Sequence, residues 1–494
     1  MKLWNLLAAV EAREVSGEGD PLVLGLCYDS RLVKPGDLFF AWHGAKVDGH
    51  RFVPEAVGKG AVAVVGEKEP KRVSAPVPYV RVDNARAALA RMADRFFDHP
   101  SGSMDIVGVT GTNGKTTTSF LLHHILERSG RKCGLVGTVR YSLGGRTLPA
   151  SRTTPEGSDL QKLLSEMREG GCRAAVLEVS SHALAQGRVE GIDFTVGVFT
   201  NLTSDHLDFH GSRERYAAAK ALLFERVASS EKREGGAAVL NADDSAWRAL
   251  DAVPRRPKTV LLYSAQGVPG ADFRAEEVRK DASGSSFRLR YPGGSLPVRV
   301  PLLGSFNVEN VLAAFAAASA LGISPPETAG ALADFPGVPG RMERFGSRDG
   351  VIAVVDYAHT EDALRKTLEA LRELAPKRLA VVVGCGGDRD RTKRPKMAAA
   401  ACELADRVVF TSDNPRSESI ERIFADMAEG VPADRRPAWI PDRRLAIELA
   451  LRDAQPGELI CIAGKGHETT QEVHGVFHPF DDRTIVSRIL AERH

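Results

Sequence analysis

The segment MDIVGVTGTNGKTTTSFLLHHILERSG at residues 104–130 constrains the fold of this chain more than any other stretch. An apolar run predicts a strand, a glycine-bearing turn follows it, and the apolar residues after the turn recur at helical spacing. A turn between a strand and a helix N-terminus can hold a phosphate with its backbone N–H groups. The segment therefore favours an α/β fold with a phosphate-binding turn.

The turn itself predicts a site for a nucleoside triphosphate. Its glycines let the main chain approach, Lys115 can reach the terminal phosphates, and the Thr116 hydroxyl suits Mg²⁺. The strict pattern G-x-x-x-x-G-K-[ST] needs glycine at position 109, where this chain has Val109. A plain glycine-rich turn is the weaker alternative, because strand, turn and helix occur in the right order. The candidate ATP-binding residues of the turn are Gly111, Thr112, Asn113, Gly114, Lys115, Thr116 and Thr117.

Further apolar runs that end in polar residues alternate with helical stretches along the chain. Three of them, at 174–181, 194–202 and 237–244, follow the phosphate turn, and four more follow the loop at 336–341. The carboxyl ends of parallel strands line the ligand crevice of an open α/β sheet. We therefore expect three α/β domains, with polar strand ends concentrated in the second and third. The expected domain ranges are 1–100, 101–335 and 336–494.

Composition and charge exclude several classes of protein. The 494 residues carry 66 Lys+Arg against 64 Asp+Glu, whereas polynucleotide binders usually have a strong basic excess. The six cysteines form no C-x-x-C pair, which argues against a zinc site or a disulfide framework and fits a reducing cytosol. No uncharged apolar stretch reaches the ~18 residues that span a membrane, and the N-terminal apolar run predicts an amphipathic helix. A cytoplasmic protein without nucleic-acid partner or membrane insertion is expected.

Carboxylates and histidines at strand ends are candidate metal ligands. Glu178 ends an apolar strand, and with the Thr116 hydroxyl it would suffice for Mg²⁺, which also binds phosphates and water. His206 and His210 match zinc less well, because Leu207 stands where the H-E-x-x-H pattern needs glutamate. Single histidines of this kind are as often simple hydrogen-bonding groups, so both interpretations stay open.

Three other features leave alternatives open. Gly384–Gly387 begins a dinucleotide fingerprint, but Arg389 stands where the third glycine is required. The basic stretch 387–396 is either a solvated loop or a receiver for an anionic group. Lys220, in the helical stretch YAAAKALLF, reads by itself as an exposed helix lysine.

Taken together, the motifs resemble those of the Mur ligase family, the ATP-dependent amino-acid-adding enzymes of bacterial peptidoglycan synthesis. They run in order over nearly the whole chain. Within the family, SDNPRSE (412–418) with GKGHE (464–468) is similar to the enzymes that add meso-diaminopimelate, since lysine-adding relatives lack the arginine of the DNPR motif. The other matching motifs are TGTNGKTT (110–117), EVSSH (178–182), TNLTSDHLDFHG (200–211), YAAAKALLF (216–224), NVEN (307–310), PGRMER (339–344) and DYAHTEDAL (356–364).

The resemblance implies an N-terminal UDP-binding α/β domain, a central P-loop ATPase-like domain with a parallel sheet, and a C-terminal Rossmann-like α/β domain. It also implies an ATP-dependent peptide synthase that joins meso-2,6-diaminopimelate to the D-Glu γ-carboxylate of UDP-MurNAc-L-Ala-D-Glu through an acyl phosphate. Such an intermediate must be kept from water, so the third domain should close over the second, with 336–341 as a hinge. Two Mg²⁺ ions, ATP, the two small-molecule substrates and a monomer are expected.

The resemblance assigns roles to individual residues as well. Lys115 would act on the γ-phosphate, with Thr116 and Glu178 on one Mg²⁺. Lys220, as a carbamate (N6-carboxylysine), would hold a second Mg²⁺ with His206. The other implied nucleotide residues are Asn307, Arg341, Asp356 and His359; those for the UDP-MurNAc dipeptide are Ser30, Thr153, Thr154, Ser180, Gln186 and Arg188; those for diaminopimelate are Arg389, Asp413, Asn414, Pro415, Arg416, Gly464 and Glu468.

Arg416 is the residue expected to select the amino acid. Its guanidinium would pair with the far carboxylate of diaminopimelate, and bound lysine would leave it unpaired.

Two departures from the family pattern and two rival functions stay open. The uridine-contacting stretch is GAKV (44–47) here, and Arg152 stands where relatives often carry asparagine. One rival is a folylpolyglutamate synthetase, against which the DNPR motif and the separate N-terminal domain argue. The other is a P-loop NTPase that uses ATP for conformational work.

Overall fold

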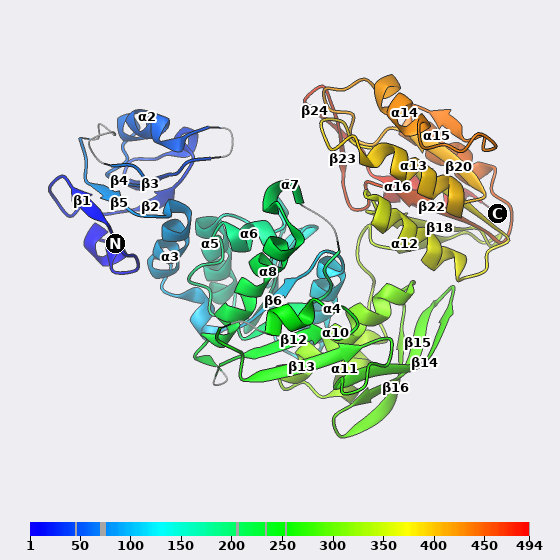
Figure 1. Ribbon diagram of the computed structural model, residues 1–494, viewed down its shortest axis with the longest axis horizontal. Coiled ribbons are helices and arrows are strands. Elements are labelled where there is room, and N and C mark those ends of the chain that lie inside the picture. Colours follow the sequence, from blue (N-terminus) through cyan, green and yellow to red (C-terminus); the bar gives the residue numbers. More distant parts are fainter. Residues whose placement is uncertain (45–46, 70–75, 204–206, 233–234, 252–253, 494) are drawn as a thin grey trace. The chain divides into compact units, whose positions relative to one another are not determined.

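The computed structural model describes residues 1–44, 47–69, 76–203, 207–232, 235–251 and 254–493 (Figure 1). The chain divides into two compact units. The first unit contains residues 1–274, 290–294 and 309–331, and the second contains residues 275–289, 295–308 and 332–494. The three expected domain ranges stay a prediction. No helix in the described ranges is long and apolar enough to cross a membrane.

The first unit opens with a five-stranded sheet in the order β1-β5-β4-β3-β2, parallel except for β1. Helix α3 begins at Ala85, because Asn84 caps it by accepting from the Ala87 N–H (2.9 Å). The predicted N-terminal helix is shorter than its apolar run and ends at Leu7. The elements are α1 (Leu3–Leu7), β1 (Glu14–Ser16), β2 (Gly25–Cys27), η1 (Ser30–Leu32), β3 (Asp37–Ala41), η2 (Gly49–Phe52), α2 (Val53–Gly58), β4 (Ala63–Gly66), β5 (Tyr79–Arg81), α3 (Ala85–Phe96) and η4 (Pro100–Ser103).

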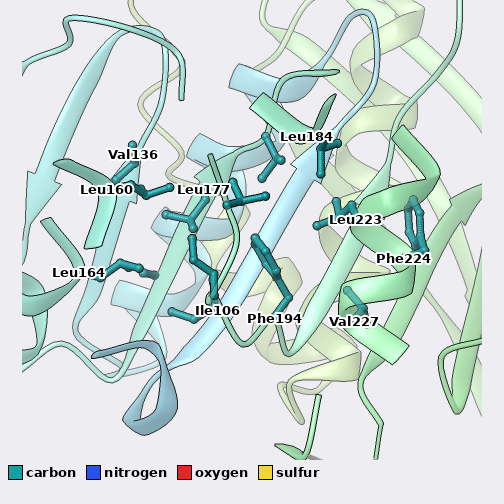
Figure 2. Close-up of a cluster of buried hydrophobic side chains, with 14 of the residues drawn as sticks. Ile106, Val136, Leu160, Leu164, Leu177, Leu184, Phe194, Leu223, Phe224 and Val227 are labelled. Atoms are coloured by element: carbon teal, nitrogen blue, oxygen red, sulfur yellow. The ribbon is translucent and has the colours of Figure 1, made fainter. Parts of the chain in front are cut away.

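A second sheet of this unit carries the phosphate turn. Strands β13-β12-β11-β6-β10-β7 pair in parallel, and β8 and β9 add an antiparallel edge that the sequence did not predict. Figure 2 shows the core beneath it, where Ile106, Leu177 and Phe194 pack near Leu223 and Phe224 of α8. The elements are β6 (Asp105–Thr110), α4 (Lys115–Arg128), β7 (Cys133–Val136), β8 (Arg140–Leu143), β9 (Thr147–Pro149), α5 (Gly157–Glu169), β10 (Ala174–Glu178), α6 (Ser181–Ala185), β11 (Val196–Phe199), α7 (Leu207–His210), α8 (Arg213–Ala228), β12 (Ala237–Asn241), α9 (Trp247–Asp251) and β13 (Thr259–Ser264).

The chain between these sheets and the last one contributes residues to both units. It contains three strands hydrogen-bonded in sequence order, which the sequence did not predict, and a helix that begins at Ser305. The elements are β14 (Phe273–Asp281), β15 (Gly284–Tyr291), β16 (Gly294–Val300), α10 (Ser305–Ala320) and α11 (Pro325–Leu332).

The second unit is built on a sheet in the order β17-β18-β22-β19-β20-β21, in which all strands but β17 are parallel. Its two faces carry separate cores, one with α12, α13 and α14 and one with α15 and α16 (Figure 1). This doubly wound arrangement places the loops after β18, β19, β20 and β22 at one sheet edge, as predicted. The elements are β17 (Glu343–Gly346), β18 (Ile352–Asp356), α12 (Glu361–Arg372), β19 (Arg378–Val383), α13 (Lys393–Leu404), β20 (Arg407–Thr411), α14 (Ile420–Ala428), β21 (Ala438–Ile440), α15 (Arg443–Arg452), β22 (Glu458–Ala463), β23 (Thr470–Val473), β24 (Val476–Pro479) and α16 (Asp482–Glu492).

Candidate active site

The phosphate turn lies between β6 and α4 and needs glycine at two positions. Gly111 and Gly114 have φ values of 149° and 84°, in the left-handed range. A Cβ atom on Gly111 would lie 1.9 Å from Thr200 Oγ1, and one on Gly114 would lie 2.3 Å from Asn310 Oδ1. Both glycines are therefore required by close neighbours as well as by backbone conformation.

The residues after β11 anchor the turn. Asn201 accepts from the Asn113 N–H through Oδ1 (2.9 Å) and from the Thr112 N–H through its carbonyl (2.8 Å). The Thr112 hydroxyl lies 3.1 Å from the Tyr216 hydroxyl. The sequence prediction missed Asn201, although it follows a strand predicted to end in polar residues. The turn is thus shaped by the protein itself.

Two lysines of the first unit converge on carbonyls of this turn. Lys115 Nζ donates to the Gly111 and Thr112 carbonyls, each at 2.9 Å. Lys220 Nζ donates to the same Gly111 carbonyl at 2.9 Å and lies 4.3 Å from the centre of the Tyr216 ring. Lys220 is only 1% exposed, so its interpretation as an exposed helix lysine is wrong.

Glu178, at the end of β10, is fully buried beside the phosphate turn. Its carboxylate accepts from the Thr116 hydroxyl (3.0 Å), the Thr138 N–H (2.9 Å) and the Thr138 hydroxyl (2.9 Å). Thr138 was missed by sequence reasoning, because it follows the short strand β7 with no motif around it. None of these donors is cationic, and a carboxylate with a hydroxyl is a donor set that Mg²⁺ accepts. The residues present fit that ion.

The predicted second metal set lies partly outside the described residues, because His206 belongs to the stretch 204–206. In the part of the chain that the structure describes, no three His, Cys, Asp or Glu side chains gather in a way that could hold a metal ion. His210, the other histidine considered for zinc, is buried and lies 3.0 Å from the Ser181 hydroxyl through Nε2.

Five of the six residues predicted for the UDP-MurNAc dipeptide gather next to Glu178. Thr154 donates from its hydroxyl to the Glu178 carbonyl (2.7 Å), and its hydroxyl accepts from the Ser180 N–H (3.1 Å). Arg188 donates from Nη1 to the Thr154 carbonyl (2.9 Å) and from Nη2 to Gln186 Oε1 (2.7 Å). The fifth, Thr153, lies with its hydroxyl 3.0 Å from that of Thr138.

Three arginines surround one buried carboxylate in this cluster. Glu156, 2% exposed, lies within 3.3 Å of both Arg86 Nε and Arg188 Nε, and 2.7 Å from Arg152 Nη1. Burial lowers the pKa of Arg188, and Glu156 acts against that shift. Arg152, which departs from the family pattern, thus pairs with Glu156. Three guanidinium groups against one carboxylate leave the cluster with an excess of positive charge.

Ser30, the sixth residue, is the first residue of the short helix η1, which follows β2. Its hydroxyl donates to Glu55 Oε2 (3.0 Å), and it is 7% exposed. Residues 45–46 of the uridine stretch GAKV lie outside the described residues.

The predicted nucleotide residues 307, 341, 356 and 359 belong to the second unit. Asn307 donates to the Leu303 carbonyl (2.7 Å), and His359 Nδ1 lies 2.8 Å from the Tyr357 carbonyl. Arg341 stacks over the Tyr357 ring (4.5 Å), and its buried Nε has no hydrogen-bond partner among the described residues. Burial raises the pKa of Asp356, and Arg341 opposes that shift.

The loops after β20 and β22 contain six of the seven residues predicted for diaminopimelate, and Arg389 follows β19. Asn414 donates from Nδ2 to Glu468 Oε2 (2.9 Å), and the fully buried Lys465 reaches both Asn414 Oδ1 (3.0 Å) and Glu468 Oε2 (2.7 Å). Gly464 has φ 114°, and a Cβ there would lie 2.6 Å from Asp413 Oδ2. Lys465 was not predicted, although it stands inside the GKGHE motif. The cluster offers both signs of charge to a ligand.

Arg416 has hydrogen-bond partners in this cluster. Its Nε donates to Glu472 Oε2 (3.1 Å) and its Nη1 donates to the Gly387 carbonyl (2.8 Å). The expectation that bound lysine would leave this guanidinium without a partner is therefore wrong. Arg389 is exposed, and its Cγ lies 3.8 Å from a Cβ built on Gly386.

The glycines after β19 serve the DNPR loop. A Cβ on Gly387 would lie 1.9 Å from the Pro415 carbonyl, and one on Gly384 would lie 2.3 Å from the Thr411 carbonyl. These glycines thus allow close approach of another loop, which favours a packing role over a dinucleotide fingerprint.

The basic stretch 387–396 is only partly solvated. Arg394 is 0% exposed and pairs with Glu418 (2.8 Å) and Asp426 (2.7 Å), while Arg391 pairs with Asp426 (2.6 Å). A solvated basic loop is therefore wrong for Arg394, and these charges shape the loop.

Comparison with known proteins agrees with this geometry. Three family models match the chain in order: "Mur ligase family, catalytic domain" at 23–97, "Mur ligase middle domain" at 109–318, and "Mur ligase, glutamate ligase domain" at 340–466. The chain belongs to the Mur ligase family.

Its similar relatives carry a more particular name. A UDP-N-acetylmuramoyl-L-alanyl-D-glutamate–2,6-diaminopimelate ligase of Geobacillus kaustophilus is 45% identical over 495 residues and covers 100% of both chains. A solved structure of an enzyme of the same name is 37% identical, with TM-score 0.68, covering 95% of this chain and 94% of the other.

The rival family shares only the fold. A folylpolyglutamate synthase of Mycobacterium tuberculosis is 19% identical, with TM-score 0.61, and the match covers 75% of this chain and 91% of that one.

Proposed function

We propose that this chain is an ATP-dependent ligase that adds meso-2,6-diaminopimelate to the D-Glu γ-carboxylate of UDP-MurNAc-L-Ala-D-Glu in peptidoglycan precursor synthesis. The 45% identity over the whole length of a relative with that name supports it. The observation that carries the proposal is the cluster of Asn414, Glu468 and Arg416, which offers a carboxylate and a guanidinium to an amino acid with an extra carboxylate.

The residues of the phosphate turn would bind and orient ATP. The D-Glu γ-carboxylate attacks the γ-phosphorus of ATP, and the bond from that phosphorus to the β-phosphate oxygen breaks. ADP is the leaving group, and the dipeptide becomes an acyl phosphate. The amine of diaminopimelate then attacks the acyl carbon, loses a proton and expels phosphate. Catalysis of such transfers rests mostly on position and charge, which Lys115 and the α4 N-terminus supply. Asn307, Arg341, Asp356 and His359 are proposed to contact the nucleotide as well.

Thr116 and Glu178 are the residues that would hold one Mg²⁺, and the proposed carbamate of Lys220 with His206 would hold the other. When bound, Mg²⁺ neutralises charge on the phosphoryl group. Carbamylation joins CO₂ to the neutral amine and releases a proton, so a buried cation becomes an anion. The burial of Lys220 next to the turn supports this proposal.

The cluster around Glu156 and Arg188 is proposed to bind the muramoyl dipeptide, with Ser30 on the uridine side. Excess positive charge beside Thr153, Thr154, Ser180 and Gln186 suits an anionic nucleotide sugar. We further propose that the enzyme works as a monomer in the cytoplasm, where its six free, buried cysteines would stay reduced.

An assay of ADP release tests the function. ADP should form only when both the nucleotide-sugar dipeptide and an amino acid are present, and meso-diaminopimelate should be used far better than L-lysine. ATP hydrolysis without either substrate would instead support an NTPase that performs conformational work. A folate substrate in place of the dipeptide should release no ADP.

A further inference from the structure

Strand β23 carries a glutamate, Glu472, that contacts the DNPR loop through main chain and side chain. The Arg416 N–H donates to the Glu472 carbonyl (3.1 Å), and Arg416 Nε donates to Glu472 Oε2 (3.1 Å). The Glu472 N–H donates in turn to Asn414 Oδ1 (2.9 Å). One residue of the β23–β24 hairpin thus holds both side chains of the motif that face the proposed amino-acid site.

The hairpin also fixes an unusual backbone at Arg416. Its φ of 53° lies in the left-handed region, which residues other than glycine rarely adopt. The His474 N–H donates to the Arg416 carbonyl (2.7 Å), and Arg416 pairs with Val473 in an isolated parallel bridge. The contacts with the hairpin therefore hold Arg416 in this backbone conformation, because an arginine by itself would favour a negative φ.

The guanidinium has five N–H groups, and the two fixed contacts leave three of them for a ligand. Nε is taken by Glu472, and one N–H of Nη1 by the Gly387 carbonyl. The other N–H groups, on Nη1 and Nη2, donate to no residue in the described ranges. The Arg416 side chain is 21% exposed and that of Glu472 is 24% exposed, so a ligand can reach the pair. Two contacts on different nitrogens fix the plane of the group and leave its Nη edge open.

We propose that Glu472 is a positioning residue that sets the preference of this site for a diamino acid with a second carboxylate over lysine. The inference rests on the proposed function and adds a residue to its amino-acid site. A long arginine side chain without Glu472 would sample several rotamers, and ordering it would weaken carboxylate binding. Lysine has no second carboxylate and does not use the Nη edge, so its use should not depend on Glu472.

The test compares Glu472→Ala and Glu472→Gln in the full-length enzyme with saturating ATP and dipeptide. Glu472→Ala should raise KM for meso-diaminopimelate about tenfold or more, change kcat by less than about twofold, and leave kcat/KM for L-lysine unchanged. Glu472→Gln should stay within about threefold of the native KM, because its amide oxygen still accepts from Nε. In an Arg416→Ala background, Glu472→Ala should have no further effect.

Glu448→Ala is the matched control, because Glu448 is a similarly buried glutamate that pairs with Arg488 (3.0 Å) elsewhere in the same unit. It should leave both amino acids unaffected. If Glu472→Ala does not fold, Glu472→Asp, whose carboxylate is one methylene shorter, must give the same rise in KM.

Three results would overturn the inference: a native preference ratio in Glu472→Ala, an equal effect in the Arg416→Ala background, or a glutamine variant as impaired as the alanine variant. A native enzyme that prefers lysine, or that needs no amino acid, would contradict the proposed function instead.

Discussion

The phosphate turn at 111–117 is held by neutral groups and by lysines that donate to its carbonyls, whereas the DNPR loop at 413–416 is held by pairs of opposite charges. Amide and hydroxyl groups of Asn201 and Tyr216 hold the turn. Around the DNPR loop, Lys465 pairs with Glu468, Arg416 with Glu472, and the buried Arg394 with two carboxylates. The two regions prepare for their ligands in different ways.

The difference follows from the charges that each ligand brings. A nucleotide triphosphate is strongly anionic, so N–H groups and lysines can await it and gain their counter-charge on binding. A diamino dicarboxylic acid carries both signs, so its site must offer both signs. Buried charges of opposite sign must be paired while the site is empty, because an unpaired buried charge is costly. The loops of the second unit are therefore built around ion pairs.

The largest effect on activity is expected at Lys115, the residue of the turn 111–117 that carries a full charge. Lys115→Ala should lower ligation about 10³-fold or more, because the phosphoryl group would lose its cation. The thermal midpoint should change little, since Lys115 donates to backbone carbonyls of its own turn. Steady-state ADP release measures the rate, with the exposed Lys162→Ala as control. Near-native ADP formation by the folded variant would contradict the assignment of the turn.

A second prediction tests whether Lys220 of the first unit acts as a buried carbamate. Lys220→Ala should lower activity about a hundredfold, and added short-chain carboxylates should partly restore it by replacing a metal ligand. Mass spectrometry under CO₂ should show the carbamate in the native protein and not in the variant. Loss of activity without rescue would mean that Lys220 acts only as a buried donor to the Gly111 carbonyl.

How far the sequence predicted these two regions depends on where their contacts lie in the chain. The phosphate turn is one contiguous motif, so Lys115 and Thr116 could be assigned from spacing alone. The paired charges join residues far apart, such as Arg416 and Glu472 or Arg394 and Asp426, and no local pattern indicates which acid meets which base. The same limit explains why Thr138 was missed.

The fold was predicted on similar terms. The parallel strands β6, β10, β11, β12, β18, β19, β20 and β22 were predicted because their buried apolar runs are continuous, whereas the parallel strands β7, β13 and β21 were not predicted. The antiparallel strands β8 and β9 and the hairpin β23–β24 were not predicted either, because strands such as Thr147–Pro149 and Thr470–Val473 are short and contain no buried residue. Tertiary contact, and not local propensity, decides such edges.

A smaller effect is expected at Thr138, whose hydroxyl is one of the neutral donors to Glu178. Thr138→Val removes the hydroxyl that donates to Glu178 (2.9 Å) and keeps the backbone N–H. Because such outer contacts orient a metal-binding carboxylate, the Mg²⁺ concentration for half-maximal activity should rise about tenfold while kcat at saturating Mg²⁺ changes less. Thr147→Val, at an exposed position of β9, is the control. An unchanged Mg²⁺ requirement would show that Glu178 is oriented without this hydroxyl.

The smallest expected effect is a difference between the DNPR loop and the phosphate turn in how their contributions to the free energy of unfolding depend on pH. Hydrogen bonds from Arg394 lower the pKa of Glu418 from 4.5 to about 2. A carboxylate whose pKa is lower in the folded state adds stability above its unfolded pKa, and that contribution is lost as the pH falls through the folded value. Glu418→Gln should therefore reduce the free energy of unfolding by about 1–3 kcal/mol at pH 7, since one charged hydrogen-bond partner is removed from a buried arginine.

The gap between native protein and Glu418→Gln should shrink as the pH falls below 4.5 and vanish near 2, which urea unfolding across that range would measure. Asn201→Ala removes a neutral side chain from the phosphate turn, so its gap from the native protein should stay constant over the same range. Glu361→Gln, at a partly exposed helical pair with Arg365, should change stability by less than about 0.5 kcal/mol at any pH. A pH-independent gap for Glu418→Gln would show that its pairing with Arg394 adds no charge-dependent stability, and the contrast between a turn held without ion pairs and a loop held by them would then fail at the Arg394–Glu418 pair.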